Sequence, residues 1–167
     1  MKIAMIFPGY GSQYVGMAKE LYDEHRIVQE YFEEASNCLP INFVKLCFAS
    51  SDAEMAQLNH AYPALFLVSC SLYALLKQEG IQPNVVTGFN QGDYAALFAV
   101  GSITFPDGLY LLNKYSTFYQ DFLNDTSVSM FRVNGVTQDA LEEFCTKVSK
   151  KAEHAAIAIY YSDTHFA

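Results

Sequence analysis

Two short hydrophobic runs predict the strands around which the chain is organised. Ile3 to Phe7 is continuous and stops at Pro8-Gly9, which is typical of a strand buried on both faces of a parallel sheet. The β-branched run Val85-Val86-Thr87 predicts a second strand, which ends at Gly88. An apolar, alanine-rich stretch follows at residues 95–100 and predicts a helix directly after this strand.

Between the two strands the pattern predicts a helical segment. A glycine-punctuated loop at residues 10–17 opens a helix that runs to about His25, and residues 28–38 form a second, amphipathic helix. Residues 41–58 are predicted to form short helical turns and loops, with Asn59 as the expected cap of the next helix. Residues 64–78 are apolar or small at almost every position, which predicts a central, buried helix.

The last part of the chain changes character after an aromatic-rich helix. Thr104 to Asp107 is a helix-start signal, and the helix is expected to reach about Leu123. We therefore expect a large subdomain over residues 1–124 and a partial small subdomain over residues 125–167. The second is predicted as a strand, a helix and a strand, over residues 128–133, 137–151 and 155–161.

The segment from Gly88 to Gly92 carries the main chemical signal. A strand, a Gly-x-x-x-Gly turn and a helix are the layout of a nucleophile elbow, in which a nucleophile sits on a strained turn beside a helix N-terminus. The middle position should hold serine or cysteine, but it holds Asn90.

Composition narrows the range of partners. The 167 residues include 18 acidic and 10 basic side chains, and the formal charge of -8 disfavours nucleic acid and anionic membranes as partners.

The four cysteines have no metal-ligand or redox spacing, so we interpret them as buried thiols in a reducing compartment. With no signal-peptide pattern and no uninterrupted apolar stretch of about 20 residues, a cytoplasmic location is expected. No cofactor or metal is expected, because the four histidines are scattered.

Two motifs in order resemble those of the malonyl-CoA:acyl carrier protein transacylase family, which includes the acyltransferase domains of polyketide and fatty-acid synthases. Residues 7–13, FPGYGSQ, resemble the family's FPGQGSQ, and residues 88–93, GFNQGD, resemble its GHSLGE. The resemblance extends over essentially the whole chain. It implies an α/β-hydrolase-like parallel-sheet core, here incomplete, followed by a β-α-β half of a ferredoxin-like small subdomain.

The resemblance also implies a ping-pong acyl transfer whose catalytic groups are replaced here. The family's elbow serine aligns with Asn90 and the histidine before it with Phe89. Two pocket glutamines align with Tyr10 and Tyr62, and the arginine that binds the malonyl carboxylate aligns with Tyr115. The base histidine would lie beyond Ala167. We expect no catalytic residue, and we take these five positions together with Gln91 as the family's substrate-binding positions.

Most of these replacements are aromatic, which suggests that the pocket has become part of the core. Tyr10, Tyr62, Phe89 and Tyr115 should converge on one cavity and fill it.

Family domains are nearly twice this length, so unpaired strand edges are expected, which a homodimer or a complementing acyltransferase or synthase chain would cover.

Two functions stay open on this interpretation. The first is a catalytically inactive transacylase-like protein that acts as a structural, docking or regulatory partner in polyketide or fatty-acid biosynthesis, with an acyl carrier protein as a further expected partner. The second is a divergent acyltransferase or thioesterase acting on acyl-CoA or acyl-carrier-protein thioesters, with catalytic groups supplied in part by another chain.

Overall fold

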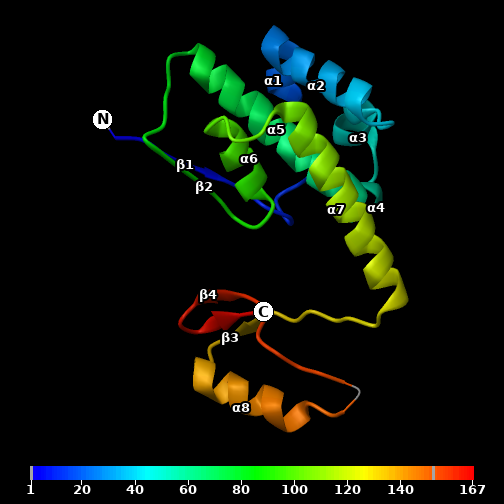
Figure 1. Ribbon diagram of the computed structural model, residues 1–167, viewed down its shortest axis with the longest axis vertical. Helices are drawn as coiled ribbons and strands as arrows, with labels where there is room; N and C mark the ends of the chain where they lie inside the picture. The colour runs from blue at the N-terminus through cyan, green and yellow to red at the C-terminus, as the bar shows by residue number, and fades with distance from the viewer. Residues whose placement is uncertain (1, 152) are drawn as a thin grey trace. The chain divides into compact units, whose positions relative to one another are not determined.

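The computed structural model describes residues 2–151 and 153–167, which divide into two compact units, Met1–Asp125 and Thr126–Ala167 (Figure 1). Each unit is described separately below. The first contains a small parallel sheet and most of the helices, and the second contains a short antiparallel sheet and one helix.

The sheet of the first unit consists of the two strands that the hydrophobic runs predict. β1 (Ala4–Phe7) pairs in parallel with β2 (Val85–Gly88), with Ala4 opposite Val85 and Phe7 opposite Gly88. Phe89 N donates to Phe7 O at 2.9 Å and so continues the pairing into the turn after β2. The ends of both strands, where glycines interrupt the apolar pattern, therefore lie side by side.

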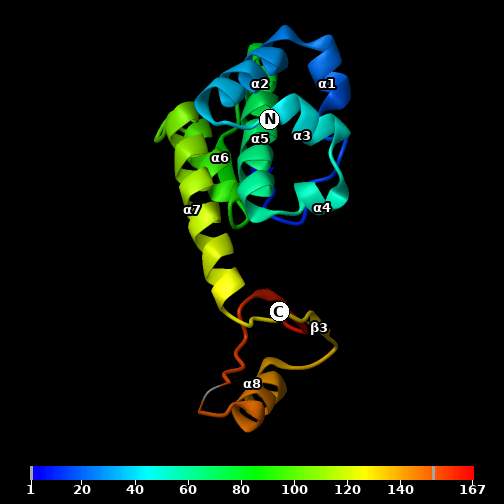
Figure 2. The same cartoon turned by 90° about the vertical axis from the view of Figure 1, so that its right-hand side faces the viewer.

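Helices make up most of the first unit (Figure 2). In chain order they are α1 (Lys19–Glu24), α2 (Arg26–Cys38), α3 (Phe43–Ala49), α4 (Asp52–Met55), α5 (Leu58–Gln78), α6 (Gly92–Ala99) and α7 (Phe105–Asp125).

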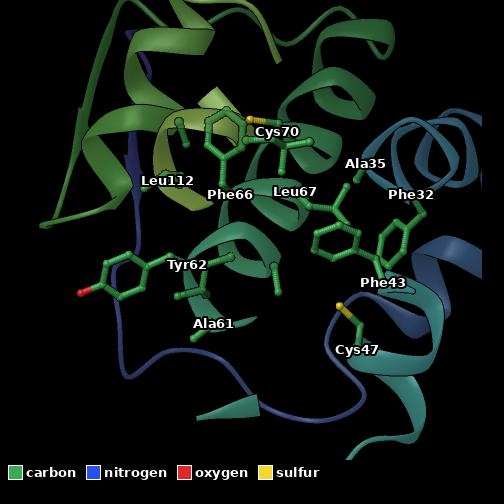
Figure 3. Packing of buried hydrophobic residues seen from close by; sticks show 14 of the residues in the cluster. Phe32, Ala35, Phe43, Cys47, Ala61, Tyr62, Phe66, Leu67, Cys70 and Leu112 are labelled. Atoms are coloured by element: carbon green, nitrogen blue, oxygen red, sulfur yellow. The ribbon is translucent and has the colours of Figure 1, made fainter. Parts of the chain in front are cut away.

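The central helix α5 confirms the prediction of a buried helix, and it packs against α2, α3, α6 and α7. Phe66, Leu67 and Cys70 on α5 are buried with Phe32 of α2 and Leu112 of α7 (Figure 3). Phe66 also stacks on Phe105 with ring centroids 5.6 Å apart. The mixed α/β architecture expected from the sequence is present in this unit.

The expected start of α5 is wrong. The helix begins at Leu58 with Gln57 as its N-cap, so Asn59 lies within the first turn and does not cap it. Leu58 and Ala61 are buried, and their packing stabilises a helical turn that begins before Asn59, the residue expected to cap the helix. Pro63 is accommodated inside the helix.

The second unit is more irregular than predicted. Its elements are β3 (Val133–Asn134), α8 (Gln138–Val148), β4 (Tyr160–Ser162) and β5 (His165–Phe166), in an antiparallel sheet of order β3-β5-β4. The helix is confirmed, with Thr137 accepting from Ala140 N as its N-cap.

The two strands predicted for this unit are largely wrong. Residues 128–132 are not in a strand, and Met130 and Phe131 are exposed, because the short β5 offers pairing only to Val133 and Asn134. The second strand begins at Tyr160, and it turns back at once into β5, a hairpin that the sequence interpretation did not include.

Candidate functional site: the turn between β2 and α6

The turn from Gly88 to Gly92 has the geometry of an elbow. Asn90 is exposed and has a φ of 54°, in the left-handed region that non-glycine residues rarely adopt, although asparagine does so more readily than most. Gly92 N donates to Phe89 O at 3.0 Å and Asp93 N to Asn90 O at 3.1 Å, so the turn passes directly into the first turn of α6. The Asn90 residue is therefore presented on a sharp, hydrogen-bonded bend.

Close backbone approach explains the glycines on either side. A Cβ on Gly92 would lie 2.3 Å from Phe7 O, and one on Gly88 would lie 2.0 Å from the Gly92 carbonyl carbon. Neither position has room for a side chain, because β1, β2 and the start of α6 meet there. The elbow geometry is thus fixed by the chain independently of the residue at position 90.

Gln91 connects the elbow to the loop after β1. Its side chain is 5% exposed, and its Oε1 accepts a hydrogen bond from Tyr10 N at 2.8 Å. Because only the amide oxygen can accept this hydrogen bond, the bond distinguishes Oε1 from Nε2 of Gln91, and Nε2 points away from Tyr10 N. Within the described residues Nε2 makes no hydrogen bond of regular geometry, and the amide faces Tyr62, whose pKa it lowers against the larger effect of burial.

Three tyrosines gather beside the elbow. Tyr62 lies edge-on to Tyr10 with ring centroids 5.8 Å apart and stacks on Tyr115 at 6.0 Å. Burial raises the pKa of Tyr62, and the nearby Gln91 amide opposes that rise. The Tyr10 hydroxyl donates to Ala56 O at 2.9 Å and so ties the loop after β1 to the end of α4. The aligned positions 10, 62 and 115 therefore do lie together.

The expectation that all four rings become core is wrong for three of them. Tyr62 is 4% exposed, whereas Tyr10, Phe89 and Tyr115 are 41%, 46% and 47% exposed. Figure 3 shows the Tyr62 ring directed away from the Phe66–Leu67 part of the core. These three residues are exposed, and Tyr10 and Tyr115 both contact the Tyr62 ring, so they form an aromatic surface beside the elbow.

The site offers little catalytic chemistry of its own. A carboxamide such as that of Asn90 is not a nucleophile at neutral pH, and burial raises the pKa of the Cys70 thiol, which keeps it protonated. The Nδ1 atom of His60 lies 3.0 Å from Glu54 O, a contact that ties down the ring. Among residues 2–151 and 153–167 no group of three or more histidine, cysteine, aspartate or glutamate side chains could hold a metal ion.

One contact that the sequence interpretation missed lies in the second unit. Ser162 Oγ lies 2.9 Å from His165 Nδ1, in the hairpin between β4 and β5. Both residues are exposed, and Thr164 N also donates to Ser162 Oγ at 3.3 Å. The three-residue spacing could have indicated a hairpin turn, and the contact closes that turn.

Comparison with known proteins identifies the class. Residues 4–124 match the model of the acyl transferase domain family, so the chain belongs to this family. Within it, the chain is 32% identical over 157 residues to a malonyl CoA-acyl carrier protein transacylase of Bacillus subtilis (strain 168), a match that covers 94% of this chain and 50% of that relative. The chain thus spans about half the length of the curated relatives it matches.

Solved structures agree with this assignment. The transacylase from Streptococcus pneumoniae superposes with a TM-score of 0.89 at 30% identity, over 99% of this chain and 53% of the other. A malonyl-transacylase in complex with a type II PKS acyl-carrier protein has the same TM-score at 22% identity, over 99% and 54% of the two chains, which shows a shared fold alone. The expected fold class is confirmed.

Proposed function

We propose that this chain is a catalytically inactive transacylase-like protein that serves as a structural or docking partner in fatty-acid or polyketide biosynthesis. The observation that carries the proposal is Asn90 at the apex of an intact elbow. Backbone geometry suited to a nucleophile is retained, while the side chain on it cannot attack a thioester.

The surface beside the elbow supports a binding role. Tyr10 and Tyr115 are exposed and contact the buried Tyr62, and the exposed Phe89 lies in the elbow turn itself. Exposed aromatic rings are typical of residues that anchor a partner. An acyl carrier protein is the proposed partner at this surface, by analogy with the relatives named for their action on that carrier. The six positions Tyr10, Tyr62, Phe89, Asn90, Gln91 and Tyr115 are the proposed substrate-binding positions, and of these Tyr62 and Gln91 are buried.

A second proposed partner is a chain that supplies the rest of the family fold. The Bacillus subtilis relative is about twice as long as the region that this chain matches, and large apolar side chains such as Ile6 and Val85 are exposed here. A homodimer is the alternative arrangement.

Acyl labelling tests the proposal. The chain is incubated with radiolabelled malonyl-CoA or acetyl-CoA and separated by denaturing electrophoresis, with the Bacillus subtilis relative as a positive control. Under the proposal the relative is labelled and this chain is not. Label retained on this chain after denaturation would refute inactivity.

The side-chain amide of Gln91, which is buried directly after Asn90, is the observation that favours a second candidate, a divergent thioesterase or acyltransferase. An amide donor beside the elbow could stabilise a thioester carbonyl oxygen, while the Asn90 carboxamide orients a water molecule. This candidate predicts thioester hydrolysis above background that is lost in Asn90→Ala. Hydrolysis equal to background in both proteins would exclude it.

A further inference from the structure

A cavity of about 460 Å³ lies in the first unit, among residues of α2, α5 and the end of α6 (Figure 2). Pockets that hold small molecules have volumes of about 300–1,000 Å³. The main lining residues are Tyr31 of α2, Tyr73, Ala74 and Lys77 of α5, and Phe98 and Ala99 of α6. The elbow lies at the start of α6 and this cavity at its last turn, so a helix of eight residues, about 12 Å long, separates them.

Three aromatic rings line the cavity, and their contacts with one another hold them in place. Phe98 lies edge-on to Tyr31 and to Tyr73, with ring centroids 6.2 Å and 6.1 Å apart. The Tyr73 hydroxyl donates to Ala99 O at 2.9 Å, which fixes the Tyr73 ring against the end of α6. Edge-to-face contacts are a preferred geometry of aromatic pairs. The cavity therefore presents a preformed apolar surface that suits a flat apolar group.

Two hydrogen-bond donors belong to the same lining. Within the described part of the chain, Lys77 forms no ion pair and the hydroxyl of the partly buried Tyr31 makes no hydrogen bond. Lys77 lies in the last turn of α5, where the helix dipole favours a cation but leaves the ammonium hydrogens free to bind an acceptor. A molecule in this cavity should therefore carry hydrogen-bond acceptors.

The charges near the cavity favour a negative group beside Lys77. Burial is the main cause of the raised pKa of Tyr31, and the negative charge of Glu34 on α2 adds a smaller contribution. A carboxylate is therefore expected to pair with the Lys77 ammonium rather than with the Tyr31 hydroxyl. Because the formal charge of the chain is -8, anions are disfavoured in general, and binding of one here should depend on this lysine.

We propose that this cavity binds a small molecule with a flat apolar body and a single carboxylate. The body would lie against the rings of Tyr31, Tyr73 and Phe98, and the carboxylate would pair with Lys77. This site is separate from the elbow, and the inference goes beyond the proposed docking role without depending on it.

The test uses the whole chain and three small probes. They are 2-naphthoate, its neutral analogue 2-naphthamide, and acetate, which has the charge without the flat body, and binding is measured by titration calorimetry. Lys77→Met removes the charge while keeping an unbranched side chain. The matched control is Lys45→Met, because Lys45 is an exposed lysine on α3, away from the residues that line the cavity. Ala74→Phe fills the cavity, and circular dichroism confirms the fold of each variant.

The expected result is one molecule of 2-naphthoate bound per chain, about tenfold or more tightly than 2-naphthamide, with no measurable binding of acetate. Lys77→Met should abolish this preference, Lys45→Met should retain it, and Ala74→Phe should abolish binding of both naphthyl probes. Equal affinity of the wild-type chain for the two naphthyl probes, no binding of either, or unchanged binding of 2-naphthoate by Ala74→Phe would overturn the proposal. Equal loss of the preference in both lysine variants would do the same. None of these results involves acyl transfer, so the labelling experiment can fail or succeed independently.

Discussion

Replacing Gly92 by alanine tests whether close backbone packing maintains the elbow. The added Cβ would lie 2.3 Å from Phe7 O and 2.8 Å from Pro8 O, whereas ordinary van der Waals contact begins at 3.4 Å. The end of β1 and the start of α6 must therefore separate by about 1 Å. Such movement strains the bond between Phe89 N and Phe7 O, which is 2.9 Å long.

The expected free-energy change is worked from three contributions. Overpacking costs about 1–3 kcal/mol and the weakened hydrogen bond about 1 kcal/mol, while alanine favours a helix over glycine by about 1 kcal/mol. Gly92→Ala should thus lower the free energy of unfolding by about 2 kcal/mol, measured by urea denaturation. Gly80→Ala is the control, because Gly80 has a φ of 79° with open space around it and should lose about 1 kcal/mol from backbone strain alone. A Gly92→Ala protein as stable as wild type, or more stable than Gly80→Ala, would refute the packing argument.

Three further outcomes are expected. Asn90→Ala should lower the free energy of unfolding, measured by urea denaturation, by about 1 kcal/mol, because Asn90 has a φ of 54° that alanine adopts at a cost. Asn90→Gly should change it by less than about 0.5 kcal/mol. Equal effects of the two substitutions would contradict a left-handed Asn90. A thiol reagent should label the exposed Cys38 quickly and leave the buried Cys47 and Cys70 unlabelled until urea is added. Burial raises the pKa of the Cys47 thiol to about 12, which keeps it protonated and unreactive. Fast labelling of all three would contradict the burial of Cys47 and Cys70. Partial burial also raises the pKa of Tyr31 from 10.0 to about 12, so the stability it contributes is full below pH 10 and is lost as the pH rises from 10 to 12. Tyr31→Phe should therefore weaken the dependence of the urea midpoint on pH over that range. An unchanged dependence would be inconsistent with a partly buried phenol.

Local signals in the sequence predicted the elements that carry the elbow. Apolar runs bounded by Pro8-Gly9 and Gly88 predicted β1 and β2, because a short apolar run that ends at proline or glycine is typical of a buried strand. The uniformly apolar stretch within α5 predicted the central helix for the same reason. The start of that helix at Leu58 was missed, since burial of an apolar residue competed with a cap signal at Asn59.

Features that depend on contacts between distant parts of the chain were harder to predict from the sequence. The alternation at residues 128–133 indicated a long strand, but pairing requires a partner, and β5 pairs with two residues only. The convergence of Tyr10, Tyr62 and Tyr115 came from the family resemblance, because no spacing in the sequence relates these positions. Their unequal exposure could not be predicted, since it depends on which surfaces the rest of the fold covers.

The central claim is that the elbow is intact while its nucleophile is absent. The most direct test is the intact mass of the whole chain after incubation with excess malonyl-CoA, with the Bacillus subtilis relative treated in parallel. The account predicts a malonyl adduct on the relative and an unmodified mass for this chain. A stoichiometric adduct on this chain, mapped by peptide sequencing to any of its residues, would contradict it.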